Sequence, residues 1–155
     1  MKNQPTLIVR KNVKVKSRQW FLKNVKHVKT ILINLLKGKK RNLAKNSLLT
    51  ILITNNQEIK NLNLKFKKKN KPTDVLSFPL KLQDQTNQKY LGDIIISNQY
   101  AKKNAVLKNI TIDQEIMTLI VHGYLHLLGY DHIIPKEAKT MFKLQNRVIK
   151  ALQGK

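Results

Sequence analysis

The sequence predicts an α+β fold in which a small mixed sheet is covered by helices. Runs rich in β-branched and apolar residues, which are typical of strands, lie in the first two thirds of the 155 residues. Segments whose apolar residues recur every three or four positions, which are typical of helices, separate these runs and fill the last third. The resulting order is strand, helix, strand, helix, two strands and then helices, without an internal repeat. We therefore expect one domain spanning residues 1–155.

The first half of the chain is predicted to hold two strands and two helices. They are a strand at 6–10, a helix capped by Ser17 and running to about Lys37, a buried strand at 47–54, and a short helix capped by Asn55 or Asn56 that includes Ile59 and Leu62. Gly38 is expected to end the long helix, because glycine readily adopts the conformation found at helix ends. The basic stretches KGKKR at 37–41 and KFKKKNKP at 65–72 are predicted to be a connector and a loop.

The second half is predicted to hold two strands and three helices. They are an extended segment at 74–80, a polar hairpin-like loop at 81–89, a strand at 90–97, and helices at 98–107, from 111 to about 128, and at 136–152. Pro79 indicates an edge strand or a strand end, because proline has no N–H to donate to a neighbour. Gly129 is expected to stop the middle helix and Pro135 to open the last one. Within the last helix, the residues expected to face inward are Ala138, Phe142, Leu144 and Val148.

The charge of the chain is large and unevenly distributed. Lys and Arg number 31 against 8 Asp and Glu, which gives a net charge of +23. Residues 1–71 hold 20 basic and one acidic residue, net +19, whereas residues 72–155 hold 11 basic and 7 acidic residues, net +4. Such a bias indicates a polyanionic partner, most readily a nucleic acid. The alternative is compositional, since an AT-rich genome also places lysines on solvated faces.

The absences in the composition narrow the class of protein. The chain has no cysteine, which excludes disulfides and every metal site built on thiolates. No apolar run reaches the roughly 18 residues that a membrane span requires. A secretory signal is also not evident. We therefore expect a cytoplasmic protein without a membrane partner.

The stretch HGYLHLLGYDH at 122–132 carries the strongest chemical signal. His122 and His126 are four positions apart, so a helix places them on one face. Gly129 allows the chain to reverse, and His132 can then reach the same point from outside the helix. Three neutral imidazoles with an open position are typical of a catalytic zinc site, which makes this a single-zinc, metallohydrolase-like domain. The alternative is that each histidine is an ordinary polar residue on a helix surface.

The residue after the first histidine limits the reaction class. Zinc proteases with the H-E-x-x-H pattern use the glutamate to accept a proton from water, and this chain has Gly123 there. Zinc can still acidify its bound water and polarise a carbonyl or phosphoryl oxygen. Asp131 adjoins a ligand and could serve as a base, as a partner for a histidine N–H, or as a turn residue.

Three segments together resemble one known family. HGYLHLLGYDH resembles the H-G-x-L-H-L-x-G-Y-D-H signature of the YbeY family, which contains bacterial endoribonucleases that mature ribosomal RNA. KPTDVLSFP at 71–79 and LGDIIIS at 91–97 resemble two further signatures of the family, in the same order and spacing. The resemblance is good over residues 45–150 and covers the N-terminal third in outline.

The resemblance implies a compact α+β fold that binds one zinc ion through His122, His126 and His132. It implies a metal-dependent cut of single-stranded RNA rather than DNA, in ribosomal RNA processing at the 3′ end of the small-subunit RNA. It also implies a part in ribosome quality control, with the ribosome or its small-subunit assembly intermediates as partners.

The chain departs from the family pattern at Lys67. The family typically has an arginine before the KPTDVLSF segment, and this sequence reads LNLKFK there. Lysine keeps the charge but loses the two-pronged grip of arginine on a phosphate. Lys67 is therefore a candidate catalytic residue with altered geometry, or one of many solvated lysines.

Two other functions fit part of this pattern. The histidine spacing is also that of a zinc peptidase, although Gly123 and the net charge of +23 oppose that reading. A non-catalytic ribosome-assembly factor with a structural zinc is the second alternative, and Lys67 favours it, because a binding protein would tolerate a weakened active site.

Overall fold

The computed structural model describes residues 5–9, 17–83 and 89–154, and it has the predicted α+β architecture. The elements are β1 (Thr6–Val9), α1 (Arg18–Leu35), α2 (Gly38–Lys45), β2 (Ser47–Thr54), α3 (Asn56–Lys67), β3 (Val75–Gln83), β4 (Lys89–Ser97), α4 (Asn98–Lys108), α5 (Ile112–Leu127) and α6 (Pro135–Gln153). The sheet order is β1-β2-β4-β3. It is mixed, because β3 alone runs antiparallel to its neighbour. None of the helices in these ranges is long and apolar enough to cross a membrane.

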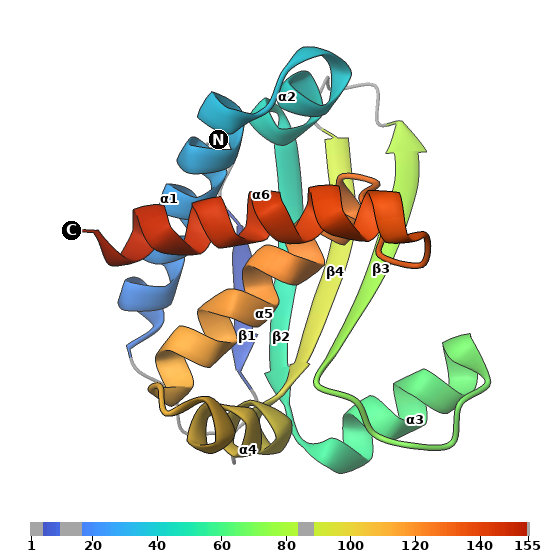
Figure 1. The fold of residues 1–155 in the computed structure, drawn as a ribbon. Coiled ribbons are helices and arrows are strands. Elements are labelled where there is room, and N and C mark those ends of the chain that lie inside the picture. The colour runs from blue at the N-terminus through green and yellow to red at the C-terminus, as the bar shows by residue number, and fades with distance from the viewer. Residues whose placement is uncertain (1–4, 10–16, 84–88, 155) are drawn as a thin grey trace.

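One face of the sheet carries the main core, beneath α1, α5 and α6 (Figure 1). Ile94 and Ile96 of β4 point into this core, whereas Ile95 between them points to the other face. This alternation follows from the two-residue period of a strand. On the other face Ile95 packs against Ile59 of α3, so α3 covers that side at one end of the sheet.

The N-terminal helix begins as predicted but ends earlier. The Ser17 hydroxyl accepts the Trp20 N–H at 3.2 Å, which is the expected N-cap. The prediction of a basic connector at 37–41 is wrong, because a second helix, α2, starts at Gly38. Gly38 has a φ of +55°, which lets the chain turn from α1 into α2. The glycine therefore separates two helices and does not start a loop. Burial of Ala44 holds α2 against the core.

The loop predicted at 65–72 is also partly wrong, since α3 continues to Lys67. Asn55 caps its start by accepting the Glu58 N–H at 2.9 Å, as one of the two predicted caps. The helix ends where Lys68 adopts the left-handed conformation, with φ of 58°. No glycine marks that end in the sequence, and the stop could therefore not be read from composition.

The strand predictions agree with the structure near the site. β2 has the predicted bounds, and β3 is an edge strand whose pairing with β4 is irregular after Pro79. β3 runs on to Gln83 and β4 begins at Lys89, so only residues 84–88 of the predicted 81–89 loop separate them, and these lie outside the described residues. Arg10 of the predicted first strand lies outside them as well.

The last helix is correct in extent and wrong at one position. Leu144 and Val148 are buried and Ala138 is half-buried, as predicted. Phe142 was expected to face inward, but its side chain is 43% exposed. Met141 takes the core position instead, because 141, 144 and 148 share one face of a helix with 3.6 residues per turn.

Candidate metal centre

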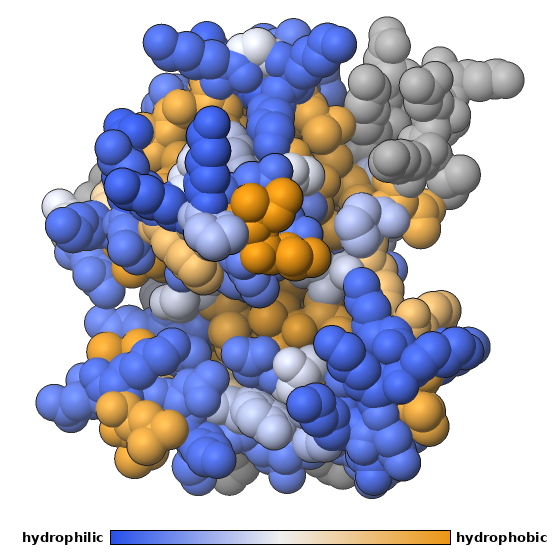
Figure 2. Space-filling view, turned by 45° about the vertical axis from the view of Figure 1, so that its right-hand side comes forward, coloured by the Kyte–Doolittle hydropathy of each residue, from blue (hydrophilic) through white to orange (hydrophobic). Residues whose placement is uncertain are grey.

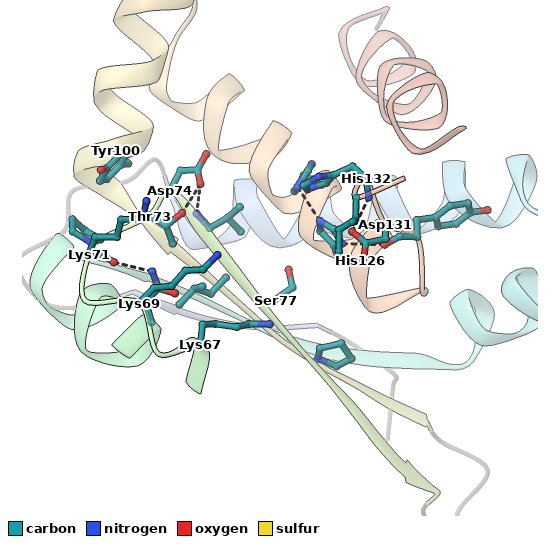
Figure 3. Close-up of a pocket in the computed structure, with 18 of the residues that line it drawn as sticks. Lys67, Lys69, Lys71, Thr73, Asp74, Ser77, Tyr100, His126, Asp131 and His132 are labelled. Atoms are coloured by element: carbon teal, nitrogen blue, oxygen red, sulfur yellow. Dashed lines mark hydrogen bonds between the residues drawn. The ribbon is translucent and has the colours of Figure 1, made fainter. Parts of the chain in front are cut away.

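The three histidines line a cleft of about 970 Å³ between the C-terminal end of α5 and the edge strand β3. Figure 3 shows His126, Asp131 and His132 on one side of this cleft, with Lys67 and Lys69 projecting from the other. The cleft is therefore lined by imidazoles at one end and by lysines across from them. It is an arrangement suited to an anionic ligand that reaches a metal ion.

The imidazoles converge as the sequence predicts. One ligand atom from each of His122, His126 and His132 lies within 4.8 Å of the others. The capping box at the start of α5, formed by Thr111 and Gln114, fixes where the helix begins. Gly129 has a φ of +80°, which allows the chain to turn back and present His132 from outside the helix. These three residues are a group that could hold a metal ion.

Hydrogen bonds set the ring orientation of the two helical histidines. His122 Nδ1 lies 2.9 Å from Gln145 Oε1, and His126 Nδ1 lies 3.0 Å from the Tyr130 carbonyl oxygen. Both partners are acceptors, so each Nδ1 carries the proton and donates. Each Nε2 is then left with a free lone pair, and the two Nε2 atoms are 3.1 Å apart. Two lone pairs at this distance repel unless a cation lies between them, so the donor set fits a metal ion.

Burial favours the protonation state that binds metal. Desolvation lowers the pKa of His122 and of His126 below the usual histidine range. The neighbouring imidazoles lower both pKa values further. The Gln145 hydrogen bond opposes this for His122, as does that to Tyr130 for His126, but desolvation is the largest cause in each case. Both rings are therefore held in the neutral form that a metal requires.

His132 is supported by an aromatic ring. It is exposed, and the Phe142 ring stacks on it with centroids 5.8 Å apart and planes tilted by 18°. The outward position of Phe142 thus has a structural consequence, because it places an apolar surface against His132, the one histidine of the cluster that lies outside α5. Asp131 Oδ1 accepts the His132 N–H at 2.7 Å, which matches the turn role considered for it.

Gly123 faces the sheet and not the cleft. A Cβ at this position would lie 2.7 Å from Ile94 Cγ2 and 3.1 Å from Ser77 Oγ. The glycine is therefore needed where α5 crosses closely over β4 and β3. A glutamate side chain at this position would begin against Ile94 and Ser77, so α5 or these side chains would have to shift to admit it.

Lys67 lies at the C-terminal end of α3 and is exposed. It lines the cleft, and its Nζ is 6.0 Å from the centre of the Phe78 ring. Lys69 and Lys71 line the same cleft. The structure thus brings Lys67 to the same cavity as the histidines, across from them.

Two residues that contact the histidines, Gln145 and Phe142, are not predicted by the sequence to lie at the site: Gln145 has no predicted role, and Phe142 is predicted to face the core. The sequence does hold a signal for Gln145. It is a polar residue on the side of α6 where Met141, Leu144 and Val148 are buried, because positions three and four apart share a helix face. Its partner could not have been named, because the crossing of α5 and α6 is a tertiary feature. The prediction that Phe142 faces the core is wrong, and no local sequence pattern indicates that its ring stacks on the His132 ring.

The fold and the site define an α+β protein with a three-histidine centre in a lysine-lined cleft. The chain belongs to the family described as endoribonuclease YbeY, whose model matches residues 12–153. The match includes most of the N-terminal third, where the motifs resemble the family only in outline.

Two relatives in the family and one solved structure support this assignment. The endoribonuclease YbeY of Pelagibacter ubique is 40% identical over 137 residues, which cover 86% of this chain and 90% of that protein. That of Sulfurihydrogenibium sp. is 48% identical over 108 residues, covering 67% and 69%. The solution structure of TM1509 from Thermotoga maritima matches with a TM-score of 0.64 at 26% identity, covering 97% of this chain and 89% of that one.

Proposed function

We propose that this protein is a zinc-dependent endoribonuclease that cuts single-stranded RNA in ribosomal RNA processing, notably at the 3′ end of the small-subunit RNA. It acts in the cytoplasm as one domain over residues 1–155, on the ribosome or its small-subunit assembly intermediates, and serves ribosome quality control. The observation that carries the proposal is the convergence of three imidazoles in a cleft lined by lysines. Membership in the endoribonuclease YbeY family supports RNA as the substrate.

In this proposal His122, His126 and His132 hold one zinc ion. When bound, zinc supplies a Lewis acid for a phosphoryl oxygen and lowers the pKa of water. Gln145 and the Tyr130 carbonyl hold the protons on the Nδ1 atoms of His122 and His126, and so keep each Nε2 available. Lys67, Lys69 and Lys71 bind backbone phosphates across the cleft and position the strand without reading its sequence.

The test is cleavage of single-stranded RNA by the purified protein. Wild type should cut the RNA, and His126→Ala should lose the activity together with bound zinc. Chelator treatment should abolish cleavage, and zinc should restore it. Cleavage that survives both treatments would count against the metal centre and would point to a contaminating nuclease.

A peptidase is disfavoured by the position of Gly123, which faces Ile94 rather than the cleft. The same protein preparation, incubated with a peptide library, separates the two activities. Peptide cleavage without RNA cleavage would overturn the proposal in favour of the peptidase.

A further inference from the structure

Helix α2 carries exposed basic side chains beside the histidine cluster that the proposed function does not use. Lys39, Arg41 and Lys45 are exposed on this helix, which contains no acidic residue. Ala44 is buried and Leu43 half-buried, so the helix rests on the core by its apolar side. The basic side chains are therefore left to solvent.

Lys40 joins this helix directly to the loop that carries the third histidine. Its Nζ donates a hydrogen bond to the Gly129 carbonyl at 3.1 Å and lies 3.4 Å from the centre of the Tyr130 ring. Gly129 and Tyr130 both line the cleft. Helix α2 therefore adjoins the histidine end of the cleft through Lys40.

The lysines of the α3 end stand on the other side of the cleft. Figure 1 shows α2 at the top of the molecule and α3 at the lower right, with the loop between α5 and α6 (residues 128–134) between them. Figure 2 shows hydrophilic side chains gathered above and below a hollow that crosses this face. Lys67 and Lys69 thus line the cleft on one side, and α2 adjoins the histidine side through the contact of Lys40 with Gly129.

We propose that α2 is a second RNA-binding surface, which takes the backbone phosphates of single-stranded RNA beyond the histidines, through Lys39 and Arg41. This inference rests on the proposed function. Lys40 is a positioning residue in it, because its amine is already committed to Gly129 and Tyr130. The consequence is that the enzyme binds a strand longer than its cleft, gripped on both sides of the metal centre.

A matched control surface exists on α4. Lys102 and Lys103 are exposed on one helix, like Lys39 and Arg41, but they lie beside the exposed Val106 and Leu107. They do not line the histidine cleft. Replacing either pair with glutamine removes the same charge, so non-specific loss of positive charge is matched between the two variants.

The experiment compares wild type, Lys39→Gln/Arg41→Gln and Lys102→Gln/Lys103→Gln. Binding of a labelled long oligouridylate and of a uridine trinucleotide is measured by fluorescence anisotropy over a series of salt concentrations. Each phosphate contact contributes about 0.7 to the log–log salt slope for a single strand, so the α2 variant should lose about 1.4 for the long RNA. The α4 variant should keep the wild-type slope. The trinucleotide offers too few phosphates to occupy both the cleft and α2, so it should bind all three proteins alike.

The possible results separate the inference from the proposed function. Equal slopes for the two variants, with wild type binding and cutting RNA, would overturn the role of α2 and leave the nuclease intact. A wild type that neither binds nor cuts RNA would overturn the nuclease, and the inference with it. Circular dichroism of both variants checks that the exposed substitutions leave the fold unchanged.

Discussion

The Nδ1 atom of His122 lies 2.9 Å from Oε1 of Gln145, and this contact joins α5 to α6 at the cluster of three histidines. The two residues are 23 positions apart, so the contact exists only because the two helices cross. It fixes which ring nitrogen carries the proton and therefore which one can bind metal. Loss of a group that orients a metal ligand in this way typically lowers metal affinity by about 10- to 100-fold.

The first prediction concerns this contact. Gln145→Leu keeps the side-chain volume but removes the acceptor, so His122 loses its fixed tautomer and ring orientation. We expect zinc affinity to fall by about 10- to 100-fold. Competition with a chromophoric zinc chelator measures the change. Gln145→Glu keeps an acceptor at the same place and should hold zinc at least as tightly as wild type. Equal affinities for wild type and the leucine variant would show that Gln145 does not orient the ligand.

The second prediction concerns removal of the metal. The core of buried apolar residues under α1, α5 and α6 does not include the histidines, so the chelated protein should remain folded. Its thermal midpoint should fall, since a bound ion at about 100 times its Kd contributes about 2.7 kcal/mol to the free energy of unfolding. Circular dichroism and a melting curve with and without chelator provide the measurement. An unfolded apoprotein would instead support a structural zinc and the assembly-factor alternative.

The third prediction concerns Gly123. A Cβ there would lie 2.7 Å from Ile94 Cγ2 in a packed core, so Gly123→Ala should overpack the α5–sheet contact. The expected cost is about 1–3 kcal/mol, which exceeds the gain of up to about 1 kcal/mol from alanine in a helix. Chemical denaturation measures the free energy of unfolding. Gly154→Ala is the control, because its Cβ would meet only ordinary contact at 3.4 Å and should change little.

The fourth prediction concerns Lys67. Lys67→Gln should raise KM for RNA and leave zinc content unchanged, because Lys67 lines the cleft but is not one of the three histidines that could hold the metal. Lys67→Arg should improve cleavage, since arginine binds a phosphate through two parallel hydrogen bonds. Lys65→Gln is the control on the same helix, because Lys65 is exposed and outside the cleft lining. If Lys65→Gln and Lys67→Gln impair cleavage equally, Lys67 has no special place in the site.

Elements whose signal lies in neighbouring residues are predicted correctly from the sequence, whereas elements that depend on tertiary contacts are not. The β2 strand was located to the residue, because its run of apolar and β-branched side chains is long and uninterrupted. The basic segments at 37–41 and 65–67 were misread as loops, because lysine on a solvated helix face has no signal that separates it from lysine in a loop. The turn at Gly38 begins α2 and the left-handed Lys68 ends α3, while burial of Ala44 holds α2 against the core.

The sequence by itself determined the fold class, the family and the three histidines, because periodicity, glycine placement and ligand spacing are properties of neighbouring residues. Only the tertiary structure decided which groups serve those histidines. Gln145 and Phe142 reach the histidines from α6, the next helix in the chain, because α6 crosses over α5. Lys40 of α2 is remote in the chain and contacts Gly129 and Tyr130, which lie between His126 and His132. The structure also explains Gly123, since close approach between α5 and the sheet leaves no space for a side chain.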